Sequence, residues 1–304
     1  MARIHVQRIG ANICYVSTND LVGNLHKLVL NTLDILDMGR NMEKIAWVTD
    51  PHLDHCGSDV LNEFFAKLGA MNPDIVLLGG DFAQGDTFDY YVDLWSSNVS
   101  VPTYFVLGNH DFYFSSIKEV RDKSIALKGI KYLGIGTIVP IDDDTSLIGH
   151  DVWYDVRNGN TRSNFEMTDF SVIRDLKHLH PKSLLFNKIK DLGDESAWYF
   201  SNILPKVFAD YNNVIVLTHV PPFEEACMYR GRPTAPDTLP FFSCQIVGKV
   251  LKDTMTSNPD KKMLVLSGHT HDEAKSVILP NLSIRVGRAF YGQPRFEILN
   301  PILF

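Results

Sequence analysis

Apolar runs alternate with amphipathic stretches along this chain from residue 42 onward. Five of the apolar runs have the length of buried strands, and each ends where polar residues begin. These predicted strands span residues 44–48, 74–78, 103–107, 214–217 and 263–266. The spacing of apolar residues predicts helices over 58–68, 88–96, 115–128 and 244–255. Strands that alternate with helices in this way predict an α/β core with parallel strands.

Weaker strand patterns lie between and after these elements. Short β segments are predicted at residues 131–133, 137–139 and 146–148. A hairpin over 275–279 and 283–286 is predicted to turn at Pro280-Asn281, and 295–299 is predicted to be the last strand.

The first 41 residues have a different pattern. Apolar residues between Asp20 and Asp37 recur with roughly helical spacing, which favours an amphipathic helix. No residue in this segment offers candidate chemistry. We expect 1–41 to be an N-terminal appendage that packs on the rest of the chain, binds a partner or has no functional role. Residues 42–304 are then expected to form the main domain.

Composition and charge narrow the class of protein. The chain has 304 residues, of which 45% are hydrophobic and 21% are charged, and this allows one large or two small globular domains. The formal net charge of -7 disfavours nucleic acid as a partner. The four cysteines form no CxxC pair, so free thiols in a reducing compartment are expected. No apolar stretch has the length of a signal sequence or membrane span, so we expect a cytoplasmic protein without a membrane partner.

Each of the five predicted strands is followed by a segment with carboxylate, imidazole or amide side chains. These segments are Asp50-Pro51-His52, Gly80-Asp81, Gly108-Asn109-His110-Asp111, Thr218-His219 and Gly268-His269-Thr270-His271. Oxygen and nitrogen ligands at strand ends are what a two-metal site needs. One such segment alone is typical of a turn with side-chain hydrogen bonds, but five in one chain indicate a site.

The ordered set resembles the calcineurin-like metallophosphoesterase superfamily, in its bacterial type, from about Met42 to the C-terminus. The resemblance implies a four-layer α-β-β-α sandwich with two mixed β-sheets, and a catalytic domain over 42–304. It implies two divalent metal ions as cofactors, and mixed nitrogen and oxygen ligands favour Mn, Fe or Zn. The ligands implied are Asp50, His52, Asp81, Asn109, His219, His269 and His271, with Asp81 shared between the two ions.

The resemblance also implies a function, which is metal-dependent hydrolysis of a phosphomonoester or phosphodiester. A hydroxide that bridges the metals attacks phosphorus, and His110 protonates the leaving oxygen as general acid. Two divalent ions, two carboxylates and the hydroxide leave a charge of about +1, which attracts a phosphate anion. Asp111 is expected either to orient or charge-stabilise His110, or to cap the helix that follows.

One departure from related enzymes is informative. Protein Ser/Thr phosphatases extend the second segment to Gly-Asp-x-x-Asp-Arg-Gly, and the later Asp supports the catalytic His. Here Gln84 stands in place of that Asp, and the Arg is absent. The sequence therefore argues against protein phosphatase activity.

Two further segments offer candidate substrate-binding residues. The segment 149–157 is dense in functional side chains and is expected to form either a pocket wall or a structural turn around Trp153. The loop after His219 is expected either to lie over the site or to be solvated. The candidates for substrate contact are His150, Arg157, Tyr229, Arg230 and Arg232.

The expected partner is a small phosphate-ester substrate. One alternative is a nuclease or phosphatase that acts on nucleic-acid ends, although the chain has no cluster of Lys and Arg. A second alternative is an interaction module that keeps the fold without catalysis. Such modules lose ligands, whereas every ligand position and His110 are present in this chain.

Overall fold

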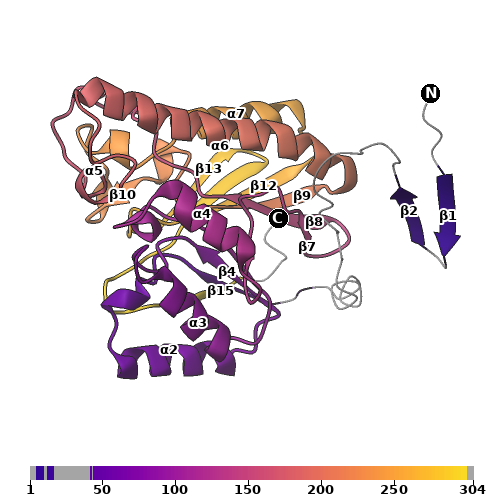
Figure 1. Ribbon diagram of the computed structural model, residues 1–304. Coiled ribbons are helices and arrows are strands. Elements are labelled where there is room, and N and C mark those ends of the chain that lie inside the picture. Colours follow the sequence, from indigo (N-terminus) through magenta and orange to yellow (C-terminus); the bar gives the residue numbers. More distant parts are fainter. Residues whose placement is uncertain (1–4, 10–11, 17–41, 43, 300–304) are drawn as a thin grey trace. The chain divides into compact units, whose positions relative to one another are not determined.

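The computed structural model describes residues 5–9, 12–16, 42 and 44–299, and its chain divides into two compact units, 1–39 and 40–304 (Figure 1). In the first unit, β1 (His5–Ile9) pairs antiparallel with β2 (Asn12–Val16). The helix predicted between Asp20 and Asp37 lies outside the described residues. The role of residues 1–41 as an appendage stays a prediction.

A five-stranded sheet carries the first three predicted strands of the second unit. Across the sheet the order is β15 (Glu297–Leu299), β3 (Ile45–Val48), β4 (Ile75–Gly79), β5 (Thr103–Val106) and β6 (Lys131–Tyr132). Strands β3 to β6 are parallel, and β15 is antiparallel to β3. The carboxyl ends of β3, β4 and β5 therefore lie along one edge.

A six-stranded sheet carries the other two predicted strands. Its order is β13 (Ala274–Leu279), β14 (Leu282–Val286), β12 (Lys262–Ser267), β9 (Asn213–Thr218), β8 (Thr145–His150) and β7 (Val139–Pro140). The inner four strands are parallel, and β13 and β7 pair antiparallel at the two edges. Both sheets are therefore mixed, as predicted.

The two sheets pack face to face, and alternate residues of each strand face the two sides. Ile45 and Trp47 of β3 share an apolar core with Ile215 of β9, between the sheets. Ala46 and Val48 point the other way and pack in the core that includes the helices. Strands covered on both faces read as continuous apolar runs, which is why the sequence pattern found them.

Helices cover the outer face of each sheet (Figure 1). The five-stranded sheet is covered by α2 (Ser58–Ala70), α3 (Phe88–Asn98) and α4 (Ile117–Ala126), and the six-stranded sheet by α6 (Lys182–Asp210) and α7 (Gln245–Ser257). This arrangement confirms the α-β-β-α sandwich. Four of these helices were predicted from the sequence, whereas α6 was not.

Helix α6 is the longest element of the second unit, with 29 residues. Its buried residues recur at helical spacing from Leu185 to Phe208, but Pro205 and Gly193 inside it are residues that usually disfavour a helix. Packing against α7 and β8 stabilises the helix despite these residues. In the part of the chain that the structure describes, no helix is both long and apolar enough to cross a membrane.

Shorter elements lie in the loops at the carboxyl edge. These are α5 (Asp169–Val172), the β10–β11 pair (Met228–Tyr229 and Arg232–Pro233), and the 3-10 turns η1 (Leu53–His55), η2 (His110–Phe112), η3 (Glu224–Ala226) and η4 (Leu239–Phe241).

Candidate metal centre

The seven predicted ligands follow the carboxyl ends of β3, β4, β5, β9 and β12, where the two sheets meet. The sheets are tied together at this edge, since the Gly79 carbonyl and the Nδ1 atom of His219 are 3.0 Å apart. The five segments, far apart in sequence, therefore lie at one place. Their side chains form two clusters that share Asp81.

The first cluster consists of Asp50, His52, Asp81 and His271, whose ligand atoms all lie within 4.8 Å of one another. The Nε2 atoms of His52 and His271 face each other at 3.1 Å. The His271 Nε2 atom is also 3.4 Å from an Asp50 oxygen. Two imidazoles and two carboxylates around one point are a donor set of the kind that binds divalent transition metals.

The second cluster consists of Asn109, His219 and His269. The Asn109 amide oxygen lies 3.1 Å from His219 Nε2 and 3.0 Å from His269 Nδ1. The Oδ1 atom of Asp81 lies 3.4 Å from His219 Nε2, and its Oδ2 atom lies 3.8 Å from His52 Nε2. The single carboxylate of Asp81 thus presents one oxygen atom to each cluster.

Charge in the first cluster favours cations. Burial raises the pKa of Asp81 well above its usual range, and the neighbouring Asp50 and Asp111 carboxylates raise it further. For Asp50 the burial acts in the same direction, but the hydrogen bond to His271 and the nearby imidazoles outweigh it, so its pKa lies below the usual range. A second negative charge is therefore costly here, and a divalent cation between the carboxylates would remove that cost.

The histidines of the two clusters differ in their affinity for protons. Burial lowers the pKa of His271, but the hydrogen bond and charge of Asp50 outweigh it, so the net shift is upward. Burial and the charge of His219 lower the pKa of His269 to about 4. Burial also lowers the pKa of His52. Neutral imidazoles are the form that binds metal.

Most of the predicted ligands have a left-handed backbone, which is rare outside glycine. These residues and their φ angles are Asp50 (48°), His52 (40°), Asp81 (51°), His269 (68°) and His271 (62°). Each such residue costs ~1–3 kcal/mol, and strain of this kind collects at functional sites. Hydrogen bonds from Asp50 N to Gly80 O and from His52 N to Asp81 O, both 3.1 Å, hold two of these loops together.

Glycine precedes a ligand where the loops come closest. A Cβ atom on Gly108 would lie 2.2 Å from an Asp81 oxygen, and one on Gly268 would lie 2.0 Å from an Asp50 oxygen. A side chain at either position would displace a carboxylate of the centre. This is the physical reason for the Gly-Asn and Gly-His pairs in the sequence.

His110 lies at the edge of the first cluster. Its Nε2 atom is 3.9 Å from Asp81 Oδ2, and its ring stacks on Tyr113 with centroids 4.2 Å apart. Its buried Nδ1 atom has no hydrogen-bond partner among the described residues. Burial and the charge of His219 lower the pKa of His110 to about 3.

Among the described residues the Asp111 carboxylate makes no hydrogen bond to the His110 ring, which corrects the expectation that it orients His110 and leaves charge stabilisation as a prediction. Its carboxylate accepts hydrogen bonds from the backbone amides of Phe82, Ala83 and Gly108, at 2.8, 3.1 and 2.7 Å. The carboxylate therefore ties the loop after β4 to the loop after β5. Nor does it cap α4, where the backbone amide of Glu119 in the first turn donates to the hydroxyl of Ser116.

Asp169, which the sequence analysis missed, braces the second cluster. Its buried carboxylate accepts hydrogen bonds from Asn109 Nδ2 at 3.0 Å and from the hydroxyls of Tyr113 and Tyr154 at 2.6 Å each. Because a carboxylate only accepts, it fixes the amide of Asn109 with Nδ2 outward and Oδ1 toward the two histidines. No motif surrounds Asp169 in the sequence, so only the fold reveals this contact.

Two predicted substrate-binding residues are occupied elsewhere. His150 is buried at 3% exposure, packs on the Tyr199 ring, and accepts a hydrogen bond from the Val152 amide. Arg157 binds Asp155 and both carboxylate oxygens of Asp194 on α6. Both expectations are corrected, because neither side chain is free to hold a phosphate. The alternative, a structural turn with a buried Trp153, describes this segment.

The other three candidates lie on the β10–β11 hairpin. The exposed Tyr229 ring lies 5.7 Å from Phe242, which in turn lies 5.2 Å from His269. The Arg230 guanidinium lies 5.1 Å over the Tyr229 ring, and Arg232 is exposed. Tyr229 and Arg230 therefore border the second cluster through Phe242, and substrate contact by the three residues stays a prediction.

Tyr291, in the loop between β14 and β15, is a further residue that the sequence analysis missed. Its half-exposed ring lies 4.4 Å from the His52 ring and 5.1 Å from the His271 ring. It also contacts His55 at 4.8 Å. An aromatic ring therefore borders the first cluster on the side open to solvent.

Comparison with known proteins supports a family assignment. Residues 43–273 match the family model described as calcineurin-like phosphoesterase. A dimetal phosphatase from Danio rerio has a similar fold, with a TM-score of 0.53 and 13% identity over 81% of this chain and 87% of that one. A phosphopantetheinyl hydrolase from Mycobacterium tuberculosis has a TM-score of 0.58 and 13% identity over 86% of this chain and 98% of that one. No curated protein matches the chain.

Proposed function

The chain belongs to the calcineurin-like phosphoesterase family and is a metal-dependent phosphoric ester hydrolase, and from this premise we propose how its residues divide the work. Asp50, His52, Asp81 and His271 hold one divalent ion. Asp81 with Asn109, His219 and His269 holds a second. The substrate is a small phosphomonoester or phosphodiester, and His110 protonates its leaving oxygen.

The observation that carries the proposal is the position of Asp81 between the two clusters. Its two oxygens lie 3.8 Å from His52 Nε2 and 3.4 Å from His219 Nε2. A carboxylate placed in this way can serve two ions at once. When bound, divalent ions such as Mn, Fe or Zn supply Lewis-acid polarisation of the phosphoryl group and activate water as the nucleophile.

The chain's own residues supply position and proton transfer. The loops of Asp50 and Asp81 are held by backbone hydrogen bonds, and Asn109 is held by Asp169, so the donors need little rearrangement. His110 is neutral in the free protein at neutral pH, because burial lowers its pKa. A phosphate anion beside it favours its protonated form, so substrate binding and loading of the acid are linked.

Small esters are favoured over nucleic-acid polymers as substrates. The chain carries a net charge of -7, and its sequence has no cluster of Lys and Arg of the kind that binds a nucleic-acid backbone. The second segment lacks the Arg of protein Ser/Thr phosphatases, and Gln84 replaces its Asp. These features leave small phosphate esters as the class to test first.

The test is turnover across a panel of phosphomonoesters and phosphodiesters, measured on the chelated full-length chain after addition of Mn, Fe, Zn or Mg. We expect no turnover before metal addition and restored turnover with at least one of the transition metals. Metal content should approach two ions per chain in the active sample. Retained turnover after complete chelation, or bound metal without turnover of any ester, would contradict the proposal.

A further inference from the structure

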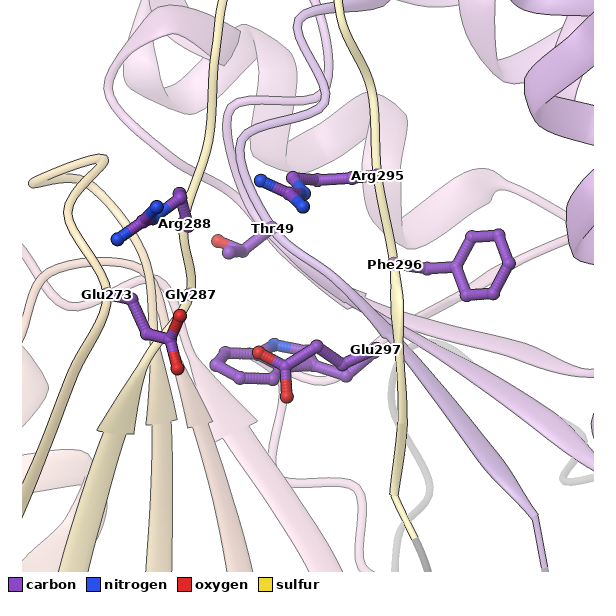
Figure 2. A pocket seen from close by; sticks show the side chains of 8 residues that line it. Thr49, Glu273, Gly287, Arg288, Arg295, Phe296 and Glu297 are labelled. Carbon is purple, nitrogen blue, oxygen red and sulfur yellow. The ribbon is translucent and has the colours of Figure 1, made fainter.

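A cavity of about 290 Å³ lies beside the metal centre, at the same edge of the two sheets (Figure 2). It is lined by Trp47, Thr49, Glu273, Gly287, Arg288, Arg295, Phe296 and Glu297. Thr49 and Gly287 directly follow the carboxyl ends of β3 and β14. Ligands of layered α/β folds commonly bind at this edge of a sheet.

Two arginines and two glutamates line the cavity, and both glutamates lie beside basic side chains outside the lining. Glu297 already pairs with Arg285, and Glu273 lies 3.5 Å from the Lys275 amine. Arg288 and Arg295 have no carboxylate partner in the part of the chain that the structure describes. In Figure 2 the Arg295 side chain extends over Thr49. Two guanidinium groups therefore remain available to an anion.

A buried donor adds to this observation. Trp47 is 2% exposed, lines the cavity, and its indole N–H finds no acceptor among the described residues. Buried donors are seldom left without a partner, because the lost hydrogen bond with water is not replaced. Guanidinium groups and an unused N–H together suit a ligand rich in oxygen acceptors.

The cavity is connected to the metal centre through short contacts. The Thr49 hydroxyl donates a 2.5 Å hydrogen bond to Asp50. The loop that carries Arg288 and Arg295 also carries Tyr291, whose ring centroid lies 4.4 Å from that of His52 and 5.1 Å from that of His271. The same loop is hydrogen-bonded to His271, because Ala289 N donates to its carbonyl at 3.0 Å.

We propose that this cavity is a second anion subsite, in which Arg288 and Arg295 bind a phosphate or carboxylate group next to the metal centre. The group is either a second acidic end of the substrate or a free anion. Ligand pockets usually enclose roughly 300–1,000 Å³, so a small acidic group fits the cavity better than a large cofactor. Binding here rests on side chains outside the metal ligands, and it stands apart from the proposed reaction.

Calorimetric titration of the metal-loaded, full-length chain with inorganic phosphate tests the subsite. We expect two binding events in the wild type, one at the metals and one in the cavity. The double variant Arg288→Gln/Arg295→Gln should weaken the cavity event at least about tenfold, because two charge-assisted contacts are lost. Arg162→Gln, which removes a charge from an exposed site, is the matched control and should keep both events.

Equal stoichiometry and affinity in the double variant and the wild type would overturn the inference. Asp81→Ala makes the complementary change, because it should remove the metal event and leave the cavity event. A wild type that binds phosphate only in the cavity would count against the proposed reaction and leave the subsite standing. The two proposals therefore fail in different ways.

Kinetics with the same double variant separate the two sources of the anion. For a substrate-borne group, KM for an ester with a second phosphate should rise at least about tenfold more than KM for a simple monoester. For a free anion, added sulfate should change the wild-type rate on the simple ester and change the variant's rate much less. Either result supports the subsite and identifies its ligand.

Discussion

The two clusters of the metal centre differ in what holds their side chains in place. In the first cluster, Asp50, His52 and His271 all sit on left-handed backbone, and the His271 side chain is 23% exposed. In the second cluster, Asn109 is held by the Asp169 carboxylate, and His269 Nε2 lies 2.9 Å from the Phe241 carbonyl. Left-handed backbone carries all the ligands of the first cluster and His269 of the second, and the second cluster adds side-chain contacts to Asn109 and His269.

The clusters also differ in charge. The effect of Asp50 on His271 outweighs that of burial, so the pKa of His271 lies above its usual value. Burial lowers the pKa of His269 to about 4. The first cluster therefore contains an ion pair between Asp50 and the partly exposed His271, whereas the imidazole of His269 in the second cluster is buried and favours its neutral form. This difference teaches that the two halves of one centre can be supported by different contacts, with Asp81 as the shared ligand.

The largest effect is expected from Asp81→Ala, which removes the ligand that both clusters share. Metal content should fall from two ions to near zero, and turnover of every ester should fall to the uncatalysed background. Asp86→Ala, at an exposed position in the same loop, is the matched control. Elemental analysis and circular dichroism check the result, and a folded Asp81→Ala protein with two bound ions would break the assignment.

His110→Ala tests a residue at the edge of the first cluster that is not needed for metal. We expect metal content to be kept and the rate on esters with alkoxide-like leaving groups to fall on the order of 10²–10⁴-fold. An activated aryl ester should lose much less, because its leaving group departs without a proton. Equal losses on both esters would point to phosphate binding by His110 instead of acid catalysis.

Tyr154→Phe and Asp169→Asn should weaken the second cluster alone. Contacts behind a metal ligand typically contribute 10- to 100-fold in affinity, so we expect a loss of about that size for one of two ions. Tyr132→Phe is the matched control, because its hydroxyl also donates to a buried carboxylate, that of Asp151, at 2.7 Å. Metal titration by calorimetry measures the loss of affinity. An equal loss in the control would show that Asp169 stabilises the fold in general and has no specific effect on the second ion.

The pH dependence of stability should separate His269 from His271 in the chelated protein. His269 has a pKa of about 4 in the fold, so the unfolded chain gains its proton first as the pH falls from about 6.5 to 4, and stability is lost. His271 has a raised pKa, so its contribution is present at low pH and is lost as the pH rises through that pKa.

Thermal melts at several pH values between 4 and 8 would check these signs. The melting temperature of His269→Gln should fall less steeply with acid than that of the wild type, and that of His271→Gln more steeply. The slopes matter here, since each substitution also changes the absolute stability. Parallel slopes for both variants would contradict the electrostatic contrast between these two histidines.

The smallest effect is expected from deletion of residues 1–41, which contain no predicted ligand of either cluster. Turnover should stay within a few-fold of the full chain, and both ions should remain bound. Loss of metal by a folded deletion protein would show that this segment contributes to the catalytic domain.

The sequence by itself determined the strands and the residues at their ends. Apolar runs covered on both faces are recognisable locally, and the Gly-Asp, Gly-Asn-His and Gly-His-Thr-His segments follow them directly. The local pattern predicted an α/β core with parallel strands, whose carboxyl ends meet at one edge of a sheet. The four-layer sandwich and the set of seven ligands were implied by the resemblance of the ordered segments to the calcineurin-like superfamily.

Only the tertiary structure decided how those residues are supported and what surrounds them. Asp169 reaches Asn109 from 60 positions away, and His271 reaches His52 from 219 away. No local pattern identifies such partners, because the sequence around a carboxylate or an arginine does not show which distant residue it contacts in the fold. His150 and Arg157 form contacts away from the site. Arg288 and Arg295 line a cavity beside it. Both arrangements follow from packing between elements that are distant along the chain, and periodicity and motif spacing do not encode such packing.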